Sequence, residues 1–168
     1  MTDNRVPPLL VGDERAILDS WLDWHRGTLA VKCDGLSDEQ LRERSAAPST
    51  LSLLGLVRHM AHVERAWFRH TLMDEDVPKL WGKDERQDAD FDDVDTASVK
   101  EAFAVWAEEI EHARRISASL PLEATGIHRR SGDTVMHREI LVHMIEEYAR
   151  HNGHADIIRE RIDGATGD

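Results

Sequence analysis

Residues 140–158 form a periodic stretch that predicts one long amphipathic helix. Apolar residues recur along it at steps of three and four, so they fall on a single helical face. Three positions on that same face are polar, namely Glu147, His151 and His154. A carboxylate turned towards a protein core is costly unless a partner compensates its charge. We therefore expect this helix to carry a compensated polar site on its inward side.

The inward polar residues have a spacing that suits metal binding. Glu147 and His151 are four residues apart, which places them one turn apart on the same face. His59 lies on the apolar side of a second amphipathic helix. Two imidazoles and a carboxylate match a catalytic zinc set and leave positions for water or substrate. The same set also suits nickel or iron(II).

We interpret His59, Glu147 and His151 as the candidate metal ligands. His154 and Asp156, a few residues further along, are candidates for orienting the ligands or carrying protons. The alternative is that these histidines are core residues satisfied by hydrogen bonds alone. The catalytic residues themselves stay unassigned.

Two other pairs compete with this set. Glu139 and His143 have the same spacing but lie nearer the start of the helix and less clearly inward. Glu109 and His112 form an E-x-x-H element of the kind used in di-iron bundles. That fold needs two such motifs and two further Glu, and Glu109 is expected off the inward face, so a di-iron centre is rejected.

The whole chain, residues 1–168, is expected to form a single all-α domain, a four-helix bundle. Its helices are expected at about residues 13–35, 37–44, 50–73, 98–120 and 135–162, the second of them short. The cap at Asp13 and the capping box at Ser37–Gln40 mark two of the starts, and Thr96 or Ser98 is expected to cap the helix that ends near residue 120. Because two connections between the long helices are themselves long, the helices need not pack in simple up-and-down order.

The acidic connection at residues 74–95 is expected to be irregular. A loop of this length inside a compact domain is often functional, so it is a candidate substrate lid. The alternative is a solvated acidic loop that Trp81 and Phe91 hold against the domain.

The charge balance and cysteine content limit the partners and the compartment. The net charge of −12 argues against nucleic acid or an anionic membrane as the main partner. No apolar run of signal-peptide or membrane-span type is present. The single cysteine, Cys33, rules out an internal disulfide and is typical of the reducing cytoplasm. We therefore expect a cytoplasmic protein that acts on a small molecule.

Residues 54–67 and 141–156 resemble the DinB/YfiT-like superfamily, most closely its actinobacterial branch of unknown function. Residues 21–26 and 35–41 fit that branch too, so the resemblance covers almost the whole chain. It implies a four-helix bundle of DinB/YfiT type with long connections, commonly a homodimer, with a divalent metal at one end of the bundle.

The resemblance also implies a ligand set. Most of the superfamily uses one His from the second helix and two His, four apart, from the fourth. Here the first of those two positions is Glu147, a departure shared by the mycothiol-dependent maleylpyruvate isomerases, which use His, Glu and His. Carried over by position, the implied ligands are His59, Glu147 and His151.

Some superfamily members are similar in being thiol S-transferases or isomerases that use mycothiol or bacillithiol. The resemblance therefore implies a metal-dependent thiol S-transferase or isomerase acting on a small electrophile. Arg58 and Arg150 are the candidates for binding the cofactor, and these two with the Arg129–Arg130 pair are candidates for binding a carboxylate. The alternative is that these arginines are only solvated. The alternatives are a non-catalytic metal-binding or stress-related protein, and a structural homodimer whose site residues bond to one another without metal.

Overall fold

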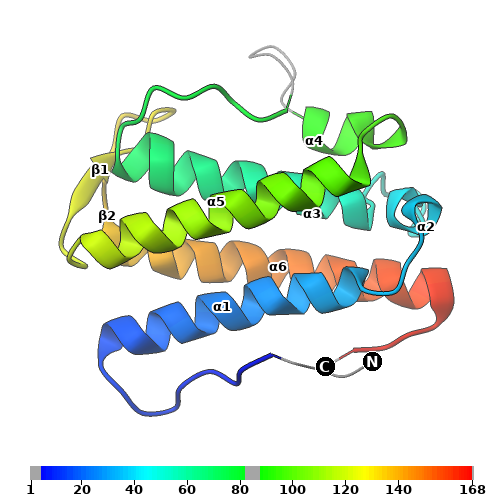
Figure 1. Cartoon of the computed structure of the whole chain (residues 1–168), viewed down its shortest axis with the longest axis horizontal. Helices are drawn as coiled ribbons and strands as arrows, with labels where there is room; N and C mark the ends of the chain where they lie inside the picture. Colours follow the sequence, from blue (N-terminus) through cyan, green and yellow to red (C-terminus); the bar gives the residue numbers. More distant parts are fainter. Residues whose placement is uncertain (1–4, 82–87, 168) are drawn as a thin grey trace. The chain divides into compact units, whose positions relative to one another are not determined.

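The computed structural model describes residues 5–81 and 88–167. Most of these residues are helical, which confirms the all-α class (Figure 1). Residues 1–4 lie outside the described part of the chain, and so do residues 82–87 of the predicted acidic connection. Within that part, no helix is long and apolar enough to cross a membrane.

The chain divides into two compact units. Unit 1 combines the two ends of the chain, Met1–Leu53 and Leu141–Asp168, and unit 2 is Leu54–Ile140. Each unit is built around long helices, and the predicted metal ligands are shared between the two units by sequence position.

Unit 1 contains α1 (Glu14–Cys33), α2 (Asp38–Arg42) and most of α6 (His137–Asp163). The side chain of Asp13 accepts a hydrogen bond from the Ala16 N–H and so caps α1. Ser37 starts α2 with the reciprocal bonds of a capping box. Both predicted helix starts are therefore confirmed.

Polar contacts show how α1 and α6 pair within unit 1. Asn152 Nδ2 donates to the His25 carbonyl over 3.0 Å. One turn or two further along both helices, Lys32 Nζ lies 2.6 Å from Asp156, and Arg159 donates to the Lys32 carbonyl over 3.0 Å. Because the paired positions rise together along the two helices, α1 and α6 run parallel (Figure 1).

Unit 2 is built on α3 (Leu53–Glu64), its π-helical continuation η1 (Arg65–Leu72), and α5 (Val99–Ser119). Ser98 caps α5, as one of the two predicted positions. Figure 1 shows α3 with η1 running in the same direction as α5, and hydrogen bonds from Arg65 and Arg69 to Glu109 make η1 a neighbour of α5. Parallel neighbours need a connection that returns along the helix length. The long connection after η1 meets this requirement.

The end of that connection is ordered structure. It contains α4 (Ala89–Asp92) and the 3₁₀ turn η2 (Asp93–Asp95), in which Ala89 and Val94 are buried. The expectation of an irregular segment throughout residues 74–95 is therefore wrong at this end. Its apolar residues pack into unit 2, which a fully solvated loop would not allow.

A short hairpin follows α5. Its strands are β1 (Thr125–Ile127) and β2 (Thr134–Met136), paired antiparallel with Gly126 opposite Val135. A side chain at Gly126 would place its Cβ 2.0 Å from the Thr71 carbonyl oxygen, so only glycine lets β1 approach η1 this closely.

Glu109 on α5 is fully buried, contrary to the expectation that it lies off the inward face. Its Oε1 accepts hydrogen bonds from Arg65 over 2.5 Å and from Arg69 over 3.1 Å, both on η1. Two guanidinium groups thus compensate a carboxylate that would otherwise be too costly to bury. The apolar periodicity of the helix predicted an outward Glu109, because such a pattern cannot show that a buried carboxylate has arginine partners on another element.

Replacing Glu109 by Gln removes this buried charge while Arg65 and Arg69 stay positive. We expect the free energy of unfolding to fall by about 3 kcal/mol, because two largely enclosed guanidinium groups lose the buried carboxylate that they share. Urea unfolding measures the change. Glu108→Gln, at an exposed neighbouring position on α5, should change it by less than about 0.5 kcal/mol. Equal effects of the two substitutions would contradict a stabilising role for the cluster.

Candidate metal-binding residues

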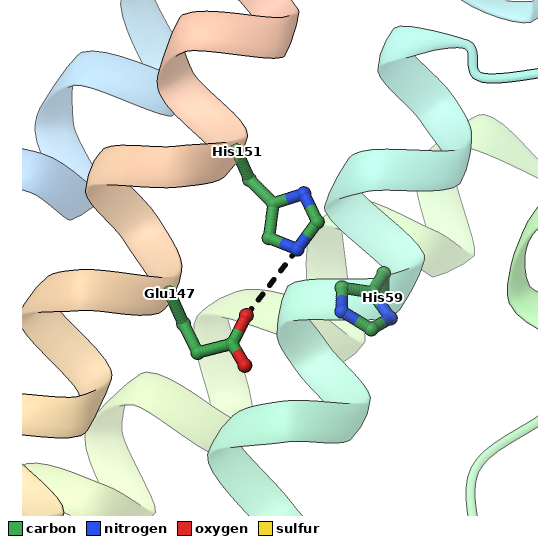
Figure 2. Close-up of side chains that lie close together, drawn as sticks. All are labelled: His59, Glu147 and His151. Carbon is green, nitrogen blue, oxygen red and sulfur yellow. Dashed lines mark ion pairs between the residues drawn. The ribbon is translucent and has the colours of Figure 1, made fainter. Parts of the chain in front are cut away.

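Glu147 lies between two histidines on α6. Its Oε1 is 3.4 Å from His143 Nε2, and its Oε2 is 3.3 Å from His151 Nε2. Figure 2 draws the second of these contacts as a dashed line. The helical repeat explains the arrangement, because residues four apart lie one above the other on the same face. Within unit 1, the structure therefore brings together the predicted pair Glu147 and His151.

The two imidazoles control the charge of Glu147. Hydrogen bonding from His143, and then from His151, holds the pKa of the Glu147 carboxyl well below its usual range, although partial burial acts in the opposite direction. The carboxylate is therefore ionised at neutral pH. An ionised carboxylate beside an imidazole is a donor pair that divalent metals bind.

His151 has a second partner. Its Nδ1 lies 3.3 Å from Nδ1 of His154, one turn further along α6. Burial lowers the pKa of His154, and the nearby His151 and Arg150 lower it further, so His154 favours its neutral form. A neutral His154 can accept the Nδ1–H of His151, which leaves His151 Nε2 on the side of Glu147. A role for His154 in orienting the ligand His151 would need a contact of this kind. That role stays a prediction.

Asp156 is turned towards α1 instead. Its carboxylate lies 2.6 Å from the ammonium group of Lys32, whose side chain is buried. Asp156 therefore forms an ion pair that joins α6 to α1. Its predicted role in orienting ligands or carrying protons stays a prediction.

His59 comes from α3 in unit 2, as labelled in Figure 2. Its side chain is 23% exposed, and its Nδ1 lies 2.7 Å from Oδ2 of Asp90. The Phe91 ring packs against the imidazole at 5.0 Å between ring centres. Sequence reasoning missed Asp90, because 31 residues separate it from His59 and no helical spacing relates them.

Arg58, a predicted cofactor contact, is buried in unit 2. Its Nε and Nη2 donate to the carbonyls of Asp90 and Ala89, over 2.9 and 2.8 Å. Its guanidinium also stacks on the Trp81 ring at 4.4 Å. Burial lowers the pKa of Arg58, while the carboxylates of Asp93, Asp90 and Glu101 act against that shift. These bonds give Arg58 a structural part in holding the acidic connection.

The other predicted cofactor contacts lie at the surface. The Arg150 side chain is 59% exposed and pairs with Glu146 over 2.5 Å. Arg129 donates to Asp74 and to the Glu75 carbonyl. Their part in binding a cofactor stays a prediction.

A second group of donors lies on α6 alone. The ligand atoms of His143, Glu146 and Glu147 lie within 4.8 Å of one another. Glu146 is already paired with Arg150, which weakens its claim as a ligand. The sequence paired His143 with Glu139, whereas the structure pairs it with Glu147, four residues in the other direction. His143 contacts Glu147 without being a predicted ligand, so its replacement is a useful comparison in any test of the predicted ligands.

The lowered pKa of Glu147 predicts a pH-dependent contribution to stability. In the unfolded chain its pKa returns to about 4.3. The stabilisation is therefore complete above that value and is lost as the pH falls through the lower pKa of the folded state. In chelator-treated protein, urea unfolding from about pH 6 to pH 3 should show the wild type losing its advantage over Glu147→Gln. A difference that stays constant over this range would contradict the assignment.

The sequence was compared with models of known protein families and with curated proteins to identify the family of the chain. The family model described as mycothiol S-transferase matches residues 17–164. No curated protein matches the chain. The match extends from within α1 to the residue after α6 and therefore covers both units. It confirms the expected DinB/YfiT-like assignment. The chain belongs to the mycothiol S-transferase family.

Proposed function

We propose that the protein is a divalent-metal-dependent S-transferase that joins mycothiol, or a closely similar low-molecular-weight thiol, to a small electrophile. The family match over residues 17–164 carries this proposal. In the reaction, the thiol loses its proton to solvent and its sulfur forms a bond to the electrophilic carbon. The leaving group departs with the electron pair of the bond that breaks.

The residues proposed to hold the metal are His59, Glu147 and His151. The chemistry of the donors supports this set, since each residue offers a nitrogen or an oxygen that zinc, nickel or iron(II) accepts. Zinc is the metal that we favour. A bound divalent metal lowers the pKa of a thiol that coordinates it, so the thiolate is available at neutral pH.

The chain's own residues prepare these donors. The histidines on either side keep Glu147 ionised. His154 holds the Nδ1 side of His151. We further propose that α1, α3 with η1, α5 and α6 form the four-helix bundle typical of the DinB/YfiT-like superfamily, which would bring His59 to the donors of α6.

Metal content is the first test. Untagged protein should contain about one divalent ion per chain by elemental analysis. Alanine at His59 or His151 should weaken zinc binding, measured by calorimetry, by more than about 100-fold, because a direct ligand contributes more than an outer contact. His143→Ala is the comparison variant: it removes a contact of Glu147 but no proposed ligand, so it should weaken zinc binding by no more than about 10-fold. If His143→Ala loses the metal and His59→Ala keeps it, the α6 group binds the ion instead.

Thiol transfer is the second test. Zinc-loaded protein is mixed with mycothiol and a small chlorinated electrophile, and both the loss of free thiol and the release of chloride are followed. We expect equal rates of the two, above the uncatalysed rate, and no enhancement with His151→Ala. Bound metal without thiol consumption across a panel of electrophiles would favour the alternative of a non-catalytic metal-binding protein.

A further inference from the structure

Asp90 is a buried carboxylate with a defined place beside His59. Its side chain is 7% exposed, and its Oδ2 lies 2.7 Å from His59 Nδ1. Its other oxygen, Oδ1, accepts the backbone N–H of Phe91 over 3.2 Å. Both carboxylate oxygens therefore have a partner, and one of those partners is a predicted metal ligand.

The acidic connection is held on α3 by groups other than this carboxylate. Arg58 donates to the main-chain carbonyls of Ala89 and Asp90. Trp81 Nε1 donates to the Arg58 carbonyl over 2.7 Å and its ring lies against the guanidinium. The burial of Ala89 and Val94 adds apolar contacts. None of these contacts involves the Asp90 side chain, so that side chain is not needed to anchor the segment.

The contact with Asp90 has a chemical consequence for His59. In a neutral imidazole, one ring nitrogen carries the proton and the other offers a lone pair. A carboxylate can only accept a hydrogen bond, so it favours the proton on Nδ1 and the lone pair on Nε2. A carboxylate in this position also makes the ring a stronger donor to a metal. Phe91 limits rotation of the ring from one side.

We propose that Asp90 is a positioning residue, which fixes the Nδ1–H tautomer of His59 and presents Nε2 as the ligand atom. The proposal rests on the proposed metal-dependent function as far as the ligand role is concerned. It also gives the acidic connection a role other than the expected lid, because this segment supplies a fixed contact to the site residue on α3.

The first test needs no metal. In chelator-treated protein at about pH 9, where an ordinary imidazole is neutral, ¹⁵N NMR distinguishes the two tautomers of His59. We expect the Nδ1–H form in the wild type and a shift towards the Nε2–H form in Asp90→Asn, whose amide can donate to Nδ1. Asp92→Asn, the same change at an exposed position on α4, should leave the tautomer unchanged. A wild-type His59 in the Nε2–H form would overturn the proposal, whether or not the variants fold.

The second test uses zinc affinity, measured by competition with a chromophoric chelator. Asp90→Asn should bind zinc about 10- to 100-fold more weakly than the wild type, and Asp92→Asn should bind it equally well. Wild-type affinity in a folded Asp90→Asn variant would overturn the proposal. If the wild type binds no zinc, the proposed metal-dependent function fails, but the tautomer measurement still decides the role of Asp90.

Discussion

Compensation of buried charge by a close partner organises the polar interior of both units. Glu109 is fully buried only because Arg65 and Arg69 donate to it. The Lys32 ammonium, buried at the contact of α1 and α6, depends in the same way on Asp156. Each pair crosses from one helical element to its neighbour. These ion pairs therefore also specify which helices pack together and in which register along their axes.

The donors near Glu147 follow the same rule with a different outcome. Its partners His143 and His151 lie on its own helix, whereas the partners of Glu109 and Lys32 lie on a neighbouring element. Imidazoles also compensate a carboxylate less completely than guanidinium groups do, because they are charged only when protonated. Such a cluster can exchange its hydrogen bonds for a cation. A pair such as Glu109 and Arg65 cannot do so without separating a fully buried carboxylate from its guanidinium partner.

The sequence predicted those features that depend on neighbours a few residues away. The caps at Asp13, Ser37 and Ser98 are local contacts, and so is the pairing of Glu147 with His151. The contact of His59 with Asp90 was not predictable in this way, because it depends on the path of the connection through space. The sequence pattern of residues 65–72 predicted an ordinary α-helix, because a short π-helical segment barely disturbs the apolar repeat.

The division of the chain has a consequence for biosynthesis. Unit 2 is continuous in sequence, whereas unit 1 joins Met1–Leu53 to Leu141–Asp168. Helix α1 is synthesised before α6, so it has no parallel partner until α6 has left the ribosome. Contacts between such distant segments raise the contact order and slow folding. During that interval the face of α1 that packs on α6 has no partner helix, whereas every segment of unit 2 has already been synthesised.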